Sequence, residues 1–189
     1  MKYVMLIRHG ESYTNRSGIL SSELNKYRLT DEGINQAKFT GEQLAGMKFD
    51  GIISSPVLRA MQTAEIINQY TKKDVIIEQR AIESDFGDYN GQKITEIPDR
   101  SREELGMESF LSQQKRMVDL INSYDGNYIV VSHAFPIKCT IAYFLELSEI
   151  ECFGIDIKYA SMSVFDVQKS KILSIGSLLI SDRVHKLFD

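Results

Sequence analysis

Two apolar runs that each stop on a histidine constrain the fold of this chain more than any other feature. The first is Tyr3–Ile7, which runs into Arg8 and His9. The second is Tyr128–Ser132, which runs into His133. Short apolar runs without polar alternation are typical of strands buried on both faces, as in a parallel sheet, where ligands bind beyond the carboxyl ends of the strands. We therefore expect the two histidines and Arg8 to lie together at a crevice.

The remainder of the chain alternates between strand and helix patterns, which indicates the α/β class. Strands are predicted at Tyr3–Ile7, Gly51–Ser54, Val75–Glu78 and Tyr128–Ser132, and helices at Asp31–Ala45, Leu58–Tyr70, Ser109–Ser123 and Ile137–Leu145. Two further strands, Ser161–Val167 and Ile172–Leu178, flank a short polar turn and are expected to pair antiparallel at a sheet edge. The irregular stretches 13–28 and 84–108 should border the site as a substrate rim.

The polar residues near the predicted strand ends favour phosphoryl chemistry. Arg59 follows the strand Gly51–Ser54 and falls in the first turn of the next helix, and Glu83 lies in a loop punctuated by glycines. An arginine fork grips phosphate oxygens, while an imidazole can attack phosphorus. Two strand-end histidines, two arginines and one loop acid thus form a coherent set for phosphoryl transfer.

Each of these residues also has a structural interpretation. His9 and His133 could be hydrogen-bonded core histidines, although a chain with three histidines that puts two of them at strand ends speaks against it. Arg59 could be a helix-surface charge paired with Glu65 or another acid. Glu83 is one of several loop carboxylates, the others being Glu78, Asp85 and Asp88.

Several motifs in order resemble the histidine phosphatase superfamily, the phosphoglycerate mutase-like group, over nearly the whole chain. They are Arg-His-Gly-Glu at 8–11, Leu-Thr-Asp-Glu-Gly-Ile-Asn-Gln-Ala at 29–37, Ser-Ser-Pro with Leu-Arg-Ala and Gln-Thr-Ala within 54–64, Val-Ser-His at 131–133 and Asp-Arg-Val-His-Lys-Leu at 182–187. The resemblance implies a three-layer α/β/α sandwich with a mostly parallel, Rossmann-like sheet and an antiparallel edge. Residues 1–189 would then form a single domain.

The resemblance also implies a role for each matching residue. His9 would be the nucleophile that becomes a phosphohistidine, and Glu83, selected by its spacing to Gly87 and Gly91, would be the general acid and base. The phosphoryl group would be held by Arg8, Asn15, Arg59, His133 and Ala134. No metal or other cofactor is implied, because the arginines neutralise the phosphate charge. His185 fits a structural role near the C-terminus better than a catalytic one.

Three departures from the family pattern leave these groups intact. Ala134 follows the second histidine where glycine is usual, Tyr89-Asn90-Gly91 replaces a common Trp-Glu-Gly, and Lys138 stands where arginine is frequent. The backbone N–H of Ala134 remains available to an anion.

The substrate is less well defined. Ser84-Asp85-Phe86-Gly87 stands where mutases of the family carry a basic Arg-His-Tyr-Gly stretch, and Asp85 would repel a second phosphate. We therefore expect hydrolysis of a small phosphorylated metabolite rather than cofactor-dependent mutase activity, with a non-catalytic binding module as the least favoured alternative. Several basic residues could bind a second anionic group of the substrate. They are Arg16, Lys26, Arg28, Arg80, Arg100 and Arg102.

Composition sets the remaining expectations. The net charge of −4 argues against nucleic acid as a partner. No apolar run approaches the ~20 residues needed to span a bilayer, and the chain starts directly with a strand, so we expect no membrane partner and a cytoplasmic location. Cys139 and Cys152 are expected to be reduced packing residues. A homodimer through an exposed edge strand remains an open alternative.

Overall fold

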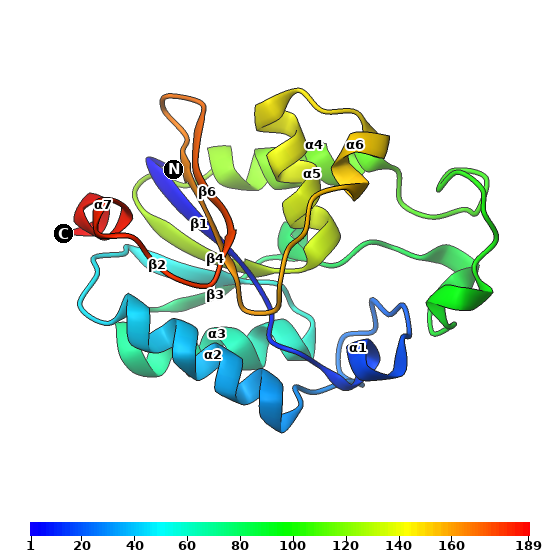
Figure 1. The fold of residues 1–189 in the computed structure, drawn as a ribbon, viewed down its shortest axis with the longest axis horizontal. Helices are drawn as coiled ribbons and strands as arrows, with labels where there is room; N and C mark the ends of the chain where they lie inside the picture. The colour runs from blue at the N-terminus through cyan, green and yellow to red at the C-terminus, as the bar shows by residue number, and fades with distance from the viewer.

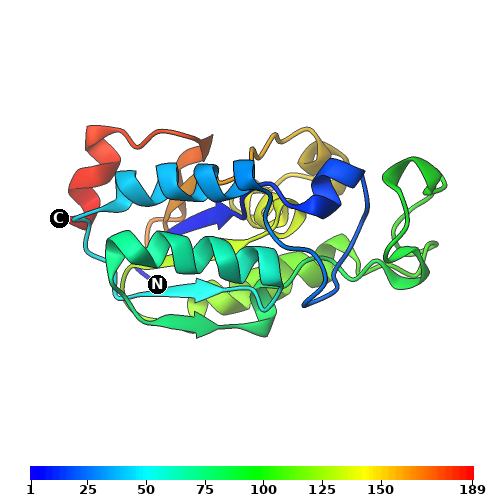
Figure 2. The ribbon, with the colours of Figure 1, turned by 90° about the horizontal axis from the view of Figure 1, so that it is seen from below.

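The computed structural model describes all of residues 1–189 and is built on one six-stranded sheet (Figures 1 and 2). The strands are β1 Tyr3–Arg8, β2 Gly51–Ser54, β3 Val75–Ile77, β4 Tyr128–Ser132, β5 Met162–Asp166 and β6 Lys171–Ser177. Their order is β3-β2-β4-β1-β5-β6. The first four are parallel, β5 is antiparallel to β1, and β6 is antiparallel to β5. The predicted mostly parallel sheet with an antiparallel edge is confirmed.

Helices cover both faces of the sheet and make the three predicted layers (Figure 1). One face carries α2 Asp31–Leu44, α3 Leu58–Thr71 and α7 Asp182–His185, and the other carries α4 Phe110–Asn122, α5 Ala134–Leu145 and α6 Glu149–Phe153. Helix α1, Tyr13–Ser17, lies with segment 87–106 at the end of the molecule away from both chain termini. Short 3₁₀ helices occur at Gln79–Ala81, Gly87–Tyr89, Ile94–Glu96 and Lys186–Phe188.

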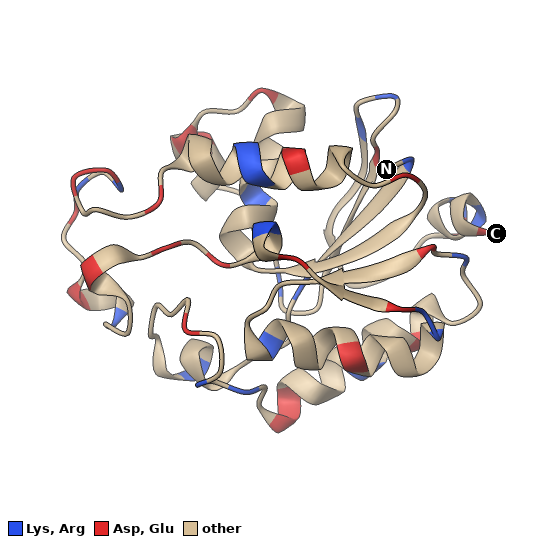
Figure 3. Cartoon of the chain, turned by 180° about the vertical axis from the view of Figure 1, so that it is seen from behind, with Lys and Arg blue, Asp and Glu red and all other residues tan.

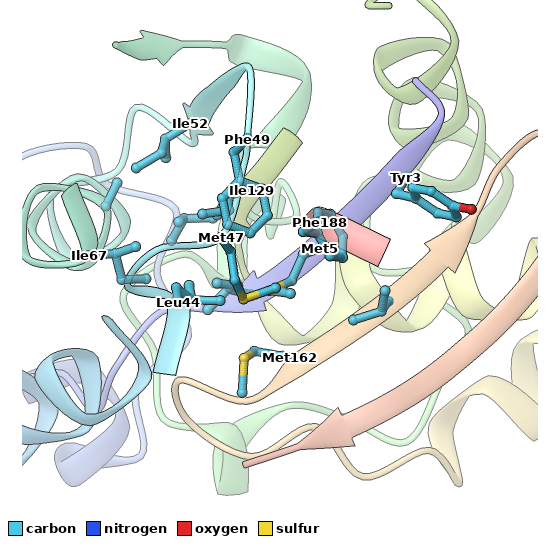
Figure 4. Close-up of a cluster of buried hydrophobic side chains, with 14 of the residues drawn as sticks. Tyr3, Met5, Leu44, Met47, Phe49, Ile52, Ile67, Ile129, Met162 and Phe188 are labelled. Carbon is cyan, nitrogen blue, oxygen red and sulfur yellow. The ribbon is translucent and has the colours of Figure 1, made fainter. Parts of the chain in front are cut away.

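The apolar strands place side chains in two separate cores. On β1, Met5 and Ile7 face the α2 side, where they join Leu44, Ile67 and Phe188 in a buried cluster (Figure 4). The alternate residues of β1 join a second cluster against α4 and α5, which includes Val4, Leu6, Met117, Leu120 and Ile141. Each fully buried side chain of this kind stabilises the fold by about 1.5–3 kcal/mol. Burial on both faces therefore accounts for the unbroken apolar run at positions 4–7 of β1.

Several helix boundaries differ from the sequence-based expectation. Helix α5 begins at Ala134 rather than at 137, so Pro136 lies inside its first turn. Proline is tolerated there because the first N–H groups of a helix have no intrahelical acceptor. The short helices α1, α6 and α7 were not predicted. Thr30 caps the N-terminus of α2, since its hydroxyl accepts a hydrogen bond from the Gly33 N–H at 3.1 Å.

Charged residues lie mainly on helices and loops. In Figure 3 acidic and basic positions alternate over the helices and connecting segments, and the strands are almost free of either. None of the helices is long and apolar enough to cross a membrane. Both cysteines are free and buried.

Candidate active site

His9 leaves the carboxyl end of β1 as a buried imidazole whose two nitrogens have different partners. Its Nδ1 lies 2.6 Å from the Gly10 carbonyl oxygen, which can only accept, so Nδ1 carries the ring proton. Its Nε2 accepts a hydrogen bond of 3.1 Å from Nε of Arg59. Gly10 is anchored in turn, because its N–H donates to the Thr63 hydroxyl at 3.1 Å. His9 therefore presents an unprotonated Nε2, the nucleophilic form of imidazole.

Arg8 is the last residue of β1 and is clamped by the segment that precedes β5. Its Nη1 donates to the Ile157 carbonyl oxygen at 2.6 Å, and its guanidinium carbon lies 4.0 Å from the centre of the Tyr159 ring. The Nε atom is buried without a hydrogen-bond partner. Arg8 thus holds a fixed positive charge and keeps donor capacity for an anion.

Arg59 is the second residue of α3 and is buried, so the alternative of a helix-surface pair with Glu65 is wrong. Besides donating to His9, its Nη2 donates to the Ser21 carbonyl oxygen at 2.9 Å and lies 3.7 Å from Oε2 of Glu83. Its Nη1 is buried and has no partner. A buried guanidinium with one free nitrogen is suited to bind an anion placed between the histidines and Glu83.

His133 caps the N-terminus of α5 and is fully buried. Its Nε2 lies 2.8 Å from Oγ of Ser55, and its Nδ1 lies 3.6 Å from Oε2 of Glu83 without a hydrogen-bond partner. The His9 and His133 rings meet edge to face, with centroids 5.1 Å apart. The two strand-end histidines therefore lie in contact, at the matching ends of their strands.

Glu83 is the loop carboxylate that reaches this group. Its side chain is 13% exposed, and Oε1 accepts the Ser84 N–H at 2.9 Å. Oε2 faces both Arg59 and His133. The other carboxylates point elsewhere: Glu78 pairs with Arg80 at 2.6 Å, and Asp85 accepts the Gly87 N–H.

Burial shifts the ionisation of these groups in opposite directions. It raises the pKa of the Glu83 carboxyl above its ordinary value, although Arg59 and Arg8 oppose the shift. It lowers the pKa of His9 and His133 well below the ordinary value, and the charge of Arg59 lowers both further. Near neutral pH both imidazoles are therefore uncharged, and Glu83 holds its proton to a higher pH than an exposed glutamate. That is the combination expected of a nucleophile beside a general acid.

The group borders a cavity of about 510 Å³. Arg8, Arg59 and Glu83 line its inner end together with Asn15 and Ala134. The two histidines are not part of the lining and lie buried against Arg59 and Glu83. The outer walls are mostly apolar, from Ile19, Leu20, Phe86, Ile94, Ile97, Pro98, Leu105, Met107, Phe135 and Phe153.

Cations also line the cavity away from the histidines. Arg102 donates from Nε to the Glu108 carbonyl oxygen at 2.8 Å and lies over the Phe135 ring, and its Nη2 is buried without a partner. Arg100 and Lys138 share this wall, whereas Arg16, Lys26, Arg28 and Arg80 are not in the lining. Asp85 is also outside the lining, so the repulsion argument against a second phosphate has no support in the structure.

The remaining predicted residues are placed as follows. Asn15 lines the cavity, but its Oδ1 already accepts from the N–H and the hydroxyl of Ser12 at 3.0 and 2.8 Å. Ala134 is the first residue of α5, so its N–H lies at the helix N-terminus. His185 pairs with Asp189 at 3.1 Å and is not in the cavity lining.

Sequence reasoning missed the residues that orient this set. Ser55 and Thr63 sit inside the segment 54–64 and could have been flagged there as buried hydroxyls beside strand-end residues. Ile157 and Tyr159, which clamp Arg8, come from about 150 residues further along the chain and carry no local signal.

Fold and site together define an enzyme of phosphoryl chemistry, and comparison with known proteins identifies its family. The family model described as "Histidine phosphatase superfamily (branch 1)" matches residues 4–175. This chain belongs to the histidine phosphatase superfamily. Its relatives include both phosphatases and mutases.

The relatives include both a mutase and phosphatases. A 2,3-bisphosphoglycerate-dependent phosphoglycerate mutase of Thermoplasma acidophilum is 42% identical, with 98% of each chain covered. Phosphoserine phosphatase 1 of Hydrogenobacter thermophilus is 29% identical over 90% of this chain and 89% of the relative. The crystal structure of an Entamoeba histolytica phosphoserine phosphatase with 3-phosphoglyceric acid superposes with a TM-score of 0.81 at 25% identity, covering 97% of this chain and 100% of the other.

Proposed function

We propose that this chain hydrolyses a phosphate monoester of a small metabolite in two steps through a phosphohistidine on His9. The observation that carries the proposal is the hydrogen bonding of His9. Its Nδ1 proton is fixed by the Gly10 carbonyl, which leaves Nε2 unprotonated and facing the guanidinium of Arg59, while the charge of Arg8 also lowers the pKa of the ring. A neutral nucleophile surrounded by positive charge is suited to attack a phosphate dianion.

In the first step, the Arg59 N–H releases the lone pair of His9 Nε2 and turns to the phosphate, Nε2 attacks phosphorus, and the bond to the ester oxygen breaks. Arg8 and Arg59 neutralise charge on the equatorial oxygens, which is most of what a protein contributes to phosphoryl transfer. Nδ1 of His133, the N–H of Ala134 and the side chain of Asn15 complete the anion site. Protonated Glu83 gives its proton to the leaving oxygen, and its raised pKa suits that task.

In the second step, Glu83 as carboxylate takes a proton from water, whose oxygen attacks the phosphohistidine. The phosphorus–nitrogen bond breaks, and the His9 lone pair is restored. The cavity of about 510 Å³ leaves room for this water beside a small ester, since a water molecule occupies about 30 Å³ in the liquid.

No metal enters this scheme, because the arginines supply the charge that a cation supplies in other phosphoryl-transfer enzymes. The chain also has no group of three or more His, Cys, Asp or Glu side chains arranged to hold a metal ion. The interspersed surface charges fit a small metabolite as partner, rather than nucleic acid or a membrane.

Phosphoglycerate mutase activity is the second candidate, and two observations favour it. The mutase of Thermoplasma acidophilum is 42% identical over almost the entire chain. The unpartnered Nη2 of Arg102 in the cavity wall could bind the second anionic group that such a substrate carries. A non-catalytic binding role is disfavoured, because every group of the proposed reaction is present.

Both candidates share the first step, so one experiment tests that step and then separates them. Hydrolysis of p-nitrophenyl phosphate is measured at pH 5–8 in excess EDTA for the wild type and His9→Ala. We expect turnover in EDTA and its loss in the variant. Phosphate release and isomer exchange from 3-phosphoglycerate are then compared with and without 2,3-bisphosphoglycerate. Isomer exchange that outpaces phosphate release would replace hydrolysis by mutase activity, and turnover retained by His9→Ala would refute the phosphohistidine.

A further inference from the structure

The hydroxyl of Ser55 lies beneath the active site, where β2 runs towards α3. Ser55 is fully buried, and its Oγ is 2.8 Å from Nε2 of His133. It does not line the cavity, and the contacts of its hydroxyl are with His133 and the Val57 N–H. Its contact is made on the side of the imidazole that faces away from Glu83, because Glu83 lies near the other ring nitrogen.

Hydrogen-bond accounting fixes the direction of this contact. The Ser55 oxygen accepts the Val57 N–H at 3.3 Å, which leaves its own proton in need of an acceptor. The acceptor within reach is Nε2 of His133, and a buried hydroxyl that donates to nothing is costly. Ser55 therefore donates to Nε2. The ring proton of neutral His133 then sits on Nδ1.

We propose that Ser55 is a positioning residue that fixes His133 as the Nδ1–H tautomer and so makes this imidazole a hydrogen-bond donor to the transferring phosphoryl group. The proposal rests on the proposed function for its catalytic consequence. The geometry supports it, because Nδ1 is buried without a partner and lies 3.6 Å from Oε2 of Glu83. An unpartnered N–H at this place can donate to a phosphoryl oxygen held between Glu83 and Arg59.

The opposite tautomer would work against the reaction. Nδ1 would then aim a lone pair at Glu83 and at the oxygens of the phosphate, and these lone pairs would repel each other. In the hydrolases that use a serine–histidine–aspartate triad, a wrong histidine tautomer is enough to lower turnover by about 10⁴-fold. The proposed reaction therefore requires control of the His133 tautomer, and a single buried hydroxyl provides it here.

The direct test is nitrogen-15 NMR of the histidine side chains in the free protein. With three histidines in the chain, the signals can be assigned by removing one ring at a time. We expect His133 of the wild type to be protonated at Nδ1 and unprotonated at Nε2. Ser55→Ala should shift the signal towards the other tautomer, and Ser55→Thr, which keeps the hydroxyl, should restore it. Ser132→Ala is the matched control, because it removes a buried hydroxyl that donates to the Ala81 carbonyl oxygen rather than to a histidine.

Kinetics provide the second readout. Ser55→Ala should lower kcat by about 10–100-fold with little change in KM, as is typical when the orienting partner of a functional histidine is lost, and Ser55→Thr should recover most of it. An Nε2–H tautomer in the wild type, or an unchanged tautomer in Ser55→Ala, would overturn the proposal. The NMR result needs no turnover, so an inert wild type would refute the proposed function alone.

Discussion

His9 and His133 stand at matching places on neighbouring strands, yet they present opposite chemistry to the same space. Strands β1 and β4 are paired so that Arg8 lies opposite Ser132, which brings the next residue of each strand, a histidine, to the same end of the sheet. At His9 the Gly10 carbonyl fixes the proton on Nδ1, and Nε2 faces Arg59. At His133 the Ser55 hydroxyl occupies Nε2, and Nδ1 faces Glu83.

The difference shows that position alone does not set the role of a strand-end histidine. One imidazole offers a lone pair because a backbone carbonyl holds its proton. The other offers a proton because a hydroxyl occupies its lone pair. In the proposed mechanism, the same residue type, with its pKa lowered by the same burial, would serve as the nucleophile in one place and as a hydrogen-bond donor in the other.

The largest expected effect comes from removing each imidazole in turn. His9→Asn should abolish both turnover and the phosphoenzyme, with a loss on the order of 10³–10⁶ in kcat, as is seen when a catalytic nucleophile is removed. His133→Asn should slow the reaction by about 10²–10³-fold and still form a phosphoenzyme, because it removes a charge stabiliser only. Acid-quenched samples analysed for acid-labile phosphate measure the difference. Equal loss of phosphoenzyme in both variants would contradict the assignment of different roles to His9 and His133.

A smaller effect is expected at Glu83, which lies beside the donor face of His133. Glu83→Gln should lower turnover of an alkyl phosphate by about 10²-fold, since it removes the general acid, and should affect p-nitrophenyl phosphate less because that leaving group departs without a proton. As pH rises through the raised pKa of Glu83, the acid is lost, so the wild-type rate should fall and the variant should lack this limb.

Glu78→Gln serves as the control for that profile, because Glu78 pairs with Arg80 and does not line the cavity. The rate of Glu78→Gln should show the same pH dependence as the rate of the wild type. An alkaline limb that survives in Glu83→Gln would assign the proton transfer to another group.

The smallest expected effect is a difference in protein stability between substitutions of Gly10 and Ala134, the residues that follow the two histidines. A Cβ on Gly10 would collide with the Gly33 carbonyl oxygen of α2, so Gly10→Ala should destabilise the protein by about 1–3 kcal/mol, the usual cost of overpacking. Ala134→Gly changes a helix start and should cost less than about 1 kcal/mol. Urea unfolding of both variants measures the contrast. Equal stability of the two would mean that the approach of Gly10 to α2 is not needed.

Most of the fold could be predicted from local pattern. Apolar runs without alternation identified β1 and β4, and the polar turn identified the antiparallel pair β5 and β6. Helix α5 begins at Ala134 rather than at 137, because Pro136 lies in its first turn, where a residue without an N–H loses no intrahelical hydrogen bond. The short helices were missed because fewer than two turns give no periodicity to detect.

The sequence by itself determined that Arg8, His9, Arg59 and His133 would gather at one end of a parallel sheet. Strand ends and helix starts depend on neighbouring residues in the chain, so local patterns predict them. Only the tertiary structure decided how each was oriented. Glu83, which the family resemblance had already selected among the loop carboxylates, was oriented by its contacts with Arg59 and His133. Arg8 was fixed by Tyr159, and the ring of His133 by Ser55. The hydrogen bonds and contacts that set charge and tautomer join residues far apart in the chain, and the spacing of residues along it carries no record of them.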